Sequence, residues 1–472
     1  MPYDAIIAGS GPNGLAAAIT LAREGREVLV LEAKETIGGG LRTAELTLPG
    51  FRHDICSAIH PLGAGSPFFK SLPLAEYGLQ WLHPGVALAH PFADGTAVAL
   101  YRDLERTADG LGRDGGAYRR LFAPLVAQWD EVAPAILGPL RPPAHPLALG
   151  SFGLRALWPA RALATAVFRT VRARALFAGL AAHSIMPLEW PATAAFGLVL
   201  GALAHVEGWP LPSGGSGSIA AAMAAYLRDL GGAIESGVEV TSLADLPGSR
   251  AVLLDVTPRQ VLRIAGANLP SSYCRALQKY RYGPGVFKID WALSGPVPWT
   301  AAACREAGTV HLGPTMEEIA TSERLVWQGA VAQRPYVLVT QPSLFDRRRA
   351  PDGRHTLWAY CHVPHGATSD QTAAIEAQIE RFAPGFKELI LARHTLNTAE
   401  LQAYNANYVG GDINGGVQDL GQLFTRPVAR TDPYSTPLDG LYICSSSTPP
   451  GGGVHGMCGY HAAKSALRFL HN

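Results

Sequence analysis

The chain opens with Asp4-Ala-Ile-Ile-Ala-Gly9-Ser-Gly11-Pro-Asn-Gly14, and Val28-Leu-Val-Leu-Glu32 follows after a helix-like run. This order predicts an apolar strand, a Gly-x-Gly-x-x-Gly turn, a helix and a second strand that ends in an acid. Gly9 permits the tight turn, Gly11 lets the backbone approach a pyrophosphate, and Gly14 lets the helix pack closely on the strand. Free N–H groups at the helix N-terminus would face the phosphates. The segment therefore predicts a dinucleotide-binding unit.

The residues around the end of the second strand indicate which dinucleotide is bound. Glu32 stands where a carboxylate accepts ribose hydroxyls. Ile37-Gly38-Gly39-Gly40-Leu41-Arg42-Thr43 follows almost at once. An NAD domain needs no glycine cluster at this place, whereas in flavoproteins with an extended FAD a glycine doublet and an arginine lie against the pyrophosphate. The alternative is a flexible glycine-rich loop.

Composition places the chain among globular proteins with a large interior. Its 472 residues are 48% hydrophobic and 16% charged, which favours two intertwined domains over one small core. A formal net charge of +1 gives no general attraction for nucleic acid. No leader segment is expected before the first strand, so a cytoplasmic location is predicted.

Six cysteines are spread along the chain without a Cys-x-x-Cys pair or a metal-ligand spacing. They are predicted to be small buried hydrophobic residues, and neither a redox-active disulfide nor a metal site is expected. The six are Cys56, Cys274, Cys304, Cys361, Cys444 and Cys458.

The middle of the chain is basic and apolar. Between Glu131 and Glu189 there is no acid, but there are arginines at positions 141, 155, 161, 169, 172 and 174. One interpretation is an amphipathic region in peripheral contact with an anionic membrane. The other is a helical cap over an apolar substrate cavity, with solvated arginines. The uncharged stretch 190–206 is too short to span a membrane.

Strands bounded by glycine or proline are predicted at 286–293, 309–312, 336–340 and 356–363. In the last of them Trp358, Tyr360 and His362 alternate onto one face. This face predicts either a wall for a lipophilic ligand or an ordinary half-buried sheet surface.

Two further stretches are predicted to belong to the same dinucleotide-binding domain as the first segment. A helix is predicted at 219–230, followed by a turn and strand at 231–240 whose Val240 backbone would meet an adenine edge. The chain ends with a predicted strand at 440–444, a loop at 445–453 and a helix at 457–470. The run Gly451-Gly-Gly-Val-His-Gly456 matches the glycine pattern formally, but no strand and acid follow it. One complete dinucleotide unit argues against a bound NAD relay of the disulfide-reductase type.

With these pieces in order, nearly the whole chain resembles the phytoene desaturase-like branch of FAD-dependent oxidoreductases. Within that branch it is similar to the bacterial relatives of pyridine nucleotide-disulfide oxidoreductase domain-containing protein 2. Besides the two glycine segments, the stretches that carry the resemblance are Tyr280-Arg-Tyr-Gly-Pro-Gly-Val-Phe-Lys288-Ile-Asp-Trp291, Gln341-Pro-Ser343, Asn405-Ala-Asn407-Tyr-Val-Gly-Gly-Asp412 and Ser447-Thr-Pro-Pro-Gly-Gly-Gly-Val-His455-Gly.

The resemblance implies an α/β fold in which a Rossmann-type FAD-binding domain is interleaved with an α+β substrate domain. The first domain would be of the glutathione reductase and amine oxidase kind and would comprise residues 1–70, 210–283 and 425–472. The second would comprise 71–209 and 284–424, with a mixed sheet and a helical cap at about 130–206.

The resemblance also implies one extended FAD between the two domains. Its cofactor-binding residues would be Gly9, Gly11, Pro12, Asn13, Gly14, Glu32, Ala33, Gly39, Gly40, Leu41, Arg42, Val240, Ser446, Gly453 and Val454. The glycine turn and Glu32 would serve the AMP and pyrophosphate portion, and Arg42 would follow the pyrophosphate and ribityl chain. Ser445 departs from the pattern, because relatives usually have glycine there, and a serine would crowd the phosphates.

Three side chains are candidates for catalysis. Lys288 occupies an apolar strand, and the same position in the related flavin amine oxidases resembles the lysine that holds water at N5 of the flavin. The alternative is a surface ion pair with Asp290 on the same strand face. His60 and His455 are further candidates, although a single histidine is often only a hydrogen-bonding residue.

The leading hypothesis is an FAD-dependent desaturase or dehydrogenase that transfers hydride between a carbon of a lipophilic, isoprenoid-like substrate and flavin N5. Oxygen or a quinone would reoxidise the flavin. A second hypothesis is a flavin amine oxidase, which would place an aromatic pair around the substrate. A third is a non-catalytic FAD-binding interaction protein.

Overall fold

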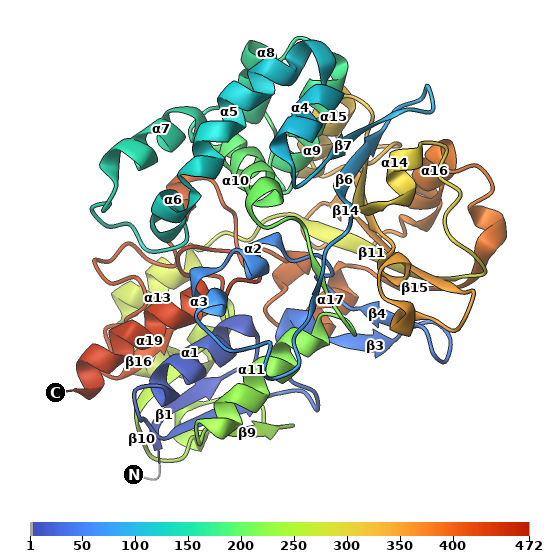
Figure 1. The fold of residues 1–472 in the computed structure, drawn as a ribbon. Helices are drawn as coiled ribbons and strands as arrows, with labels where there is room; N and C mark the ends of the chain where they lie inside the picture. Colours follow the sequence, from blue (N-terminus) through green and yellow to red (C-terminus); the bar gives the residue numbers. More distant parts are fainter. Residues whose placement is uncertain (1–2, 472) are drawn as a thin grey trace.

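The computed structural model of the protein describes residues 3–471. Residues 1, 2 and 472, which the predicted first domain includes, lie outside the described part. Figure 1 shows a parallel sheet and its helices at the lower left, where both termini lie, a layer of helices above it, and a second sheet to the right.

The first sheet has five parallel strands in the order β16-β10-β1-β2-β9. The strands are β1 (Tyr3–Ala8), β2 (Val28–Glu32), β9 (Ala233–Ser236), β10 (Ser249–Leu254) and β16 (Leu441–Ile443). They come from three distant parts of the chain, as Figure 1 shows by their colours. One continuous sheet therefore joins the beginning, middle and end of the sequence.

Both faces of this sheet are covered by helices, which is why its central strands are mostly apolar. Ile7 of β1 packs into the core under α1, and its neighbour Ile6 packs into the core on the opposite face. Helix α1 lies against α11 and α19 on the first face, and α12 and α13 cover the second. These helices are α1 (Pro12–Ala22), α11 (Gly217–Asp229), α12 (Pro258–Ala265), α13 (Ser271–Gln278) and α19 (Met457–Leu470).

The second sheet has seven strands in the order β15-β11-β14-β13-β12-β6-β7. It is mixed, because β12 pairs with β6 in parallel and the other pairs are antiparallel. The strands are β6 (Val86–Pro91), β7 (Ala97–Leu100), β11 (Gly285–Leu293), β12 (Ala307–Leu312), β13 (Val337–Thr340), β14 (His355–Val363) and β15 (Ile390–Leu396).

The two faces of the second sheet have different partners. Phe287, Ile289 and Trp291 alternate along β11 into an apolar core with α14 (Ala302–Arg305) and α16 (Thr372–Phe382). Lys288 and Asp290, which lie between them, project to the opposite face. This opposite face of the second sheet borders the cavity between the two sheets.

A layer of helices lies above the first sheet and beside the second (Figure 1), and several of these helices line the cavity described below, which agrees with the interpretation of this region as a helical cap. Its helices are α4 (Leu104–Gly110), α5 (Gly115–Ala127), α6 (Trp129–Ile136), α7 (Pro146–Ala156), α8 (Ala160–Val167), α9 (Val171–Ala182) and α10 (Thr193–Val206). Within residues 3–471, no helix is both long and apolar enough to cross a membrane.

Short elements connect these layers. Two small antiparallel pairs are β3 (Thr43–Glu45) with β4 (Arg52–Asp54) and β5 (Trp81–Leu82) with β8 (Leu211–Pro212). The remaining α-helices are α2 (Pro61–Ala64), α3 (Pro67–Lys70), α15 (Met316–Trp327), α17 (Thr398–Tyr404) and α18 (Leu420–Leu423).

Most predicted elements are found, with two corrections. The predicted strand at 231–240 ends at Ser236, because Gly237 turns the chain at a φ of 75°, and Val240 therefore lies in a loop. The cysteines are all free, but only four are buried, since Cys56 and Cys274 are half-buried. Cys56 is half-buried because it lines the cavity described in the next subsection.

Candidate functional site

One cavity of about 890 Å³ runs from the carboxyl ends of the first sheet to the second sheet and the helical layer. Its lining includes all three predicted catalytic residues, Lys288, His60 and His455. It also includes most of the predicted cofactor residues, namely Gly9, Gly11, Pro12, Asn13, Glu32, Ala33, Gly39, Gly40, Arg42, Val240, Ser446, Gly453 and Val454. Segments more than 400 residues apart in the sequence therefore meet around one space.

Two of the predicted cofactor residues do not line this cavity. A Cβ atom on Gly14 would lie 2.0 Å from the carbonyl oxygen of Gly9, so Gly14 allows helix and turn to pack closely. Leu41 is fully buried in the apolar core.

The glycine turn is closed by a side chain from a distant strand. Gly9 has a φ of 107°, which favours glycine. A Cβ atom on Gly11 would lie 2.8 Å from Oδ2 of Asp255, which follows β10. The Gly14 N–H donates to that same oxygen at 3.0 Å. Burial raises the pKa of Asp255 to about 8, and the nearby Glu32 charge adds to the effect.

Asp255 was not predicted from the sequence as a site residue. It ends the run Ala251-Val-Leu-Leu-Asp255, and an acid directly after an apolar parallel strand is the signal that could have found it. The partner strand lies more than 200 residues from the turn, so no local pattern connects the two.

Glu32 organises the cavity floor at the end of β2. Its carboxylate accepts the backbone N–H groups of Ser10 and Lys34, each at 3.0 Å, and pairs with the Arg42 guanidinium at 2.9 Å. Arg42 also donates from Nε to the carbonyl oxygen of Thr36 at 2.8 Å. The two predicted cofactor-binding residues, Glu32 and Arg42, thus form an ion pair with each other, and both line the cavity.

The C-terminal loop brings a second group of glycines to the cavity. Gly453 has a φ of 128°. Ser445 lines the cavity, and its hydroxyl donates to the carbonyl oxygen of Val256 at 2.8 Å. His455 Nδ1 accepts the backbone N–H of Met457 at 3.0 Å and so serves the start of α19.

His60 has a defined tautomer, because its partner has only one proton to give. The Ser216 hydroxyl donates to the carbonyl oxygen of Ser57 at 2.6 Å. His60 Nε2, which lies 2.8 Å from the same hydroxyl, must therefore donate to it, and Nδ1 keeps its lone pair. Burial lowers the pKa of His60 to about 4, so the ring is neutral near pH 7.

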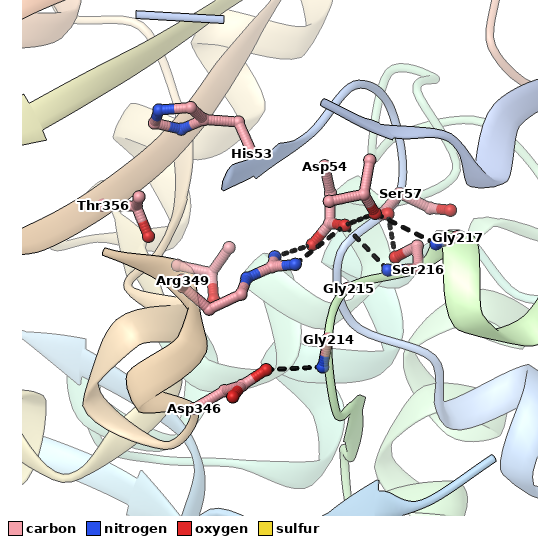
Figure 2. A network of polar contacts seen from close by, with 12 residues as sticks. His53, Asp54, Ser57, Gly214, Gly215, Ser216, Gly217, Asp346, Arg349 and Thr356 are labelled. Atoms are coloured by element: carbon pink, nitrogen blue, oxygen red, sulfur yellow. Dashed lines mark hydrogen bonds and ion pairs between the residues drawn. The ribbon is translucent and has the colours of Figure 1, made fainter. Parts of the chain in front are cut away.

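The loop that carries Ser216 is held by Arg349 and Asp346, which lie between β13 and β14 (Figure 2). The Arg349 guanidinium pairs with the Asp54 carboxylate, which also accepts the Ser216 N–H and the Thr43 hydroxyl, each at 2.7 Å. Asp346 accepts the Gly214 N–H at 2.6 Å. Burial alone would raise the pKa of Asp54, but the Arg349 charge holds it below its ordinary value.

Lys288 forms an ion pair with Asp290, but not at the surface. The side chains are 2% and 0% exposed, and Lys288 lies in the cavity wall with Asp290 behind it. His53 lies 3.6 Å and His394 3.8 Å from the Asp290 carboxylate. Although burial favours the neutral acid, the Lys288 charge lowers the pKa of Asp290. The pair is therefore a buried structural contact that also borders the cavity.

The part of the cavity away from the glycine turns is apolar. Helices α6, α7 and α10 contribute leucine, isoleucine, valine and phenylalanine side chains to it. Trp358 and Tyr360 face it from β14, with ring centroids 5.1 Å apart and planes at 84°. His362 instead pairs with Glu323 in the interior. The rings do not face each other, so they form no aromatic sandwich of the amine oxidase kind.

The residues present fit an extended dinucleotide. The cavity extends from the glycine turn to the second sheet, and the Glu32 carboxylate lies at the predicted ribose position. A Cβ atom on Gly39 would lie 3.0 Å from Cα of Gly11, so the two glycine segments approach each other closely. The buried Asn13 Oδ1 has no hydrogen-bond partner among residues 3–471. In the same range, no group of three or more histidine, cysteine or acidic residues could hold a metal ion.

Comparison with known proteins agrees with this geometry. A model of the NAD(P)-binding Rossmann-like domain matches residues 7–72. The chain is 27% identical to pyridine nucleotide-disulfide oxidoreductase domain-containing protein 2 of Mus musculus, over 100% of this chain and 94% of that protein. It is 25% identical to the phytoene desaturase (neurosporene-forming) of Rhodobacter capsulatus, over 96% of this chain and 92% of that one. The chain is a flavoprotein oxidoreductase.

A solved structure supports the fold of this flavoprotein. Putrescine oxidase bound to putrescine superposes with a TM-score of 0.64 at 18% identity and covers 100% of both chains. The predicted fold, with a Rossmann-type domain, a mixed second sheet and a helical cap, is confirmed. The predicted enzyme class is confirmed as well.

Proposed function

We propose that the protein binds one extended FAD and transfers hydride between a carbon of a lipophilic, isoprenoid-like substrate and flavin N5. The observation that carries this proposal is one continuous cavity, which joins two glycine turns to an apolar chamber under the helical cap. The desaturase name of the Rhodobacter capsulatus relative supports the same substrate class. We assign the cofactor to residues 1–70, 210–283 and 425–472, and we place this chain among bacterial relatives of the mouse protein.

The chain's own residues would supply binding, orientation and exclusion of water. The N–H groups of the first glycine turn and the Glu32 carboxylate would hold the AMP and pyrophosphate portion. Val240 would meet the adenine, and Gly453 and Val454 would lie along the flavin end. The leucine-rich cap would keep water from the reacting carbon, because its lining offers few polar atoms.

His60 and Lys288 are the residues that we assign to proton handling. His60 is neutral and keeps the Nδ1 lone pair, so it is able to take a proton when a substrate carbon loses hydride. Lys288 offers an ammonium whose charge is balanced by Asp290. His455 is a less suitable base, since its Nδ1 already accepts the Met457 N–H.

The test is anaerobic reduction of the FAD-reconstituted protein by defined lipid classes. Isoprenoid hydrocarbons, isoprenoid alcohols and fatty acids are added separately, and the loss of the oxidised flavin absorption is followed. We expect at least one isoprenoid class to bleach the flavin, and oxygen or a soluble quinone to restore the colour. Failure of every lipid class would contradict the proposal, and bleaching by putrescine or another amine would favour an amine oxidase.

A specific surface also supports peripheral contact with a membrane. Leu140, Leu147 and Leu154, on and just before α7, are 76%, 89% and 77% exposed. Leu140 also borders the cavity, so the exposed leucines adjoin its lining. Arg141 is exposed beside them and would favour anionic lipid. Co-sedimentation with anionic vesicles, lost in Leu147→Ser/Leu154→Ser, would test this contact.

A further inference from the structure

One wall of the cavity carries polar groups that have no partner. Thr309 Oγ1 and Trp358 Nε1 are buried without a hydrogen bond among residues 3–471. Burial raises the pKa of the Tyr360 phenol, and no described residue forms a hydrogen bond with its hydroxyl. All three residues line the cavity, although Thr309 is only 5% and Tyr360 only 9% exposed.

The second sheet places these groups on a common face. Tyr360 of β14 lies opposite Leu338 of β13, and Leu338 lies opposite His311 of β12. Residues opposite each other on neighbouring strands share a face, as do residues two apart on one strand. Trp358 is two residues from Tyr360, and Thr309 is two residues from His311. The three polar groups therefore project from one surface into one space.

This arrangement needs an explanation, because an unpartnered buried polar group costs about 1–3 kcal/mol. Such groups are rare in native proteins. The neighbouring Thr340 hydroxyl, on the same surface, does have a partner, since it donates to the carbonyl oxygen of Gly308 at 2.6 Å. The sheet can therefore satisfy a hydroxyl at this depth. Thr309 Oγ1 and Trp358 Nε1 differ from it, because both are buried without a partner among residues 3–471, although their side chains line the cavity.

The chemistry of the three groups indicates what that molecule presents. An indole N–H only donates, whereas the threonine and tyrosine hydroxyls both donate and accept. A single oxygen atom is the group that suits this set best. A full negative charge is not called for, because Lys288, which lies opposite Tyr360 on β11, is already paired with Asp290.

We propose that Thr309, Trp358 and Tyr360 bind a neutral oxygen of the substrate, so that the substrate is an oxygen-bearing lipophile such as an isoprenoid alcohol or aldehyde. A bare hydrocarbon would leave the three groups without partners. The inference rests on the proposed function, since it refines the substrate class of the same cavity. Within that cavity, these residues determine specificity and the cap accommodates the apolar chain.

The experiment compares farnesol with farnesene, which share an apolar C15 chain and differ in the hydroxyl. Dissociation constants are measured by calorimetry on the full-length, FAD-reconstituted protein. We expect the wild type to bind farnesol about ten-fold more tightly, as one or two net hydrogen bonds would give. Thr309→Val and Tyr360→Phe should each lower this ratio about three- to five-fold and leave the farnesene constant within two-fold. Tyr226→Phe, outside the cavity, is the matched control and should change neither constant.

Three results would overturn the inference. The first is equal affinity of the wild type for both ligands. The second is an equal loss of both affinities in Thr309→Val and Tyr360→Phe. The third is loss of bound FAD in these variants, which would make the residues cofactor ligands. A wild type that takes up no FAD would instead refute the proposed function, and the same ligand pair on the FAD-free protein would still decide the inference.

Discussion

The Arg349 guanidinium contacts the Asp54 carboxylate in the interior, with side chains 1% and 2% exposed. Asp54 belongs to β4 near the first glycine segments, whereas Arg349 belongs to the loop between β13 and β14. The same carboxylate accepts the Ser216 N–H, and Ser216 in turn sets the tautomer of His60. The ion pair therefore connects the loop between β13 and β14 to the segment that carries Ser216 (Figure 2). The Ser216 hydroxyl in turn contacts the candidate catalytic His60.

Arg349→Met should destabilise the protein by about 3–5 kcal/mol, because it leaves the Asp54 charge buried without its partner. Urea unfolding followed by circular dichroism measures this change. Arg119→Met is the control, since Arg119 pairs only with the exposed Glu105 and Asp109 among the described residues and should leave the free energy of unfolding nearly unchanged. Similar effects of both substitutions would contradict a special role of the buried pair.

Asp255 should make stability depend on pH. Its folded pKa of about 8 exceeds the ordinary value, so the folded state keeps a proton that the unfolded chain has already lost. The stabilisation is complete below about pH 4 and is lost as pH rises towards 8, by at most about 1.4 kcal/mol per pH unit.

Asp255→Asn should flatten this dependence. Urea unfolding of both proteins at pH 5, 6, 7 and 8 gives the difference in slope directly. Glu32 is the charged neighbour that contributes to the raised pKa, and it is unchanged in the variant. Parallel pH profiles for wild type and variant would show that the Asp255 carboxyl is already ionised at pH 5.

Gly11→Ala should lower the affinity for FAD at least ten-fold. The new Cβ atom would lie 2.8 Å from Asp255 Oδ2, so the turn would have to move away from its present path. Titration of the FAD-free protein with FAD, followed by quenching of flavin fluorescence, measures the constant. Gly266→Ala is a matched control, because nothing lies within 4 Å of its added Cβ atom. Unchanged affinity in Gly11→Ala would place the pyrophosphate elsewhere.

Lys288→Met should cost about 3 kcal/mol or more, since Asp290 would remain charged in a fully buried position. Adding Asp290→Asn should recover much of that loss, because the remaining amide carries no charge. Urea unfolding of both single variants and the double variant forms the required cycle. Additive losses would mean that the two side chains act independently despite their contact.

The local parts of the site were predictable from the sequence. The spacing of Gly9, Gly11 and Glu32 determines a strand, turn, helix and strand, and the alternation of Trp358 and Tyr360 predicts a face that does border the cavity. These features depend on residues close together in the chain, so the pattern and the structure share one cause.

Features that depend on distant contacts could not be predicted. Asp255 meets Gly14 only because β10 pairs beside β1, and His455 is engaged by Met457 through a loop conformation that composition does not determine. Arg42 was expected along the pyrophosphate, but its charge is first compensated by Glu32. Such pairings are set by tertiary packing, where burial of one charge requires a partner.

The strand order of the first sheet has a consequence for protein engineering. Residues 7–72, which carry the recognisable glycine motif, contain β2 but only residues 7 and 8 of β1. An isolated fragment of residues 7–72 would lack β10, which pairs with β1, and β9, which pairs with β2. It would also lack α11 and α19, which pack against α1. Residues 7–72 therefore do not form a folding unit by themselves. A minimal nucleotide-binding module must combine three separate stretches of the chain.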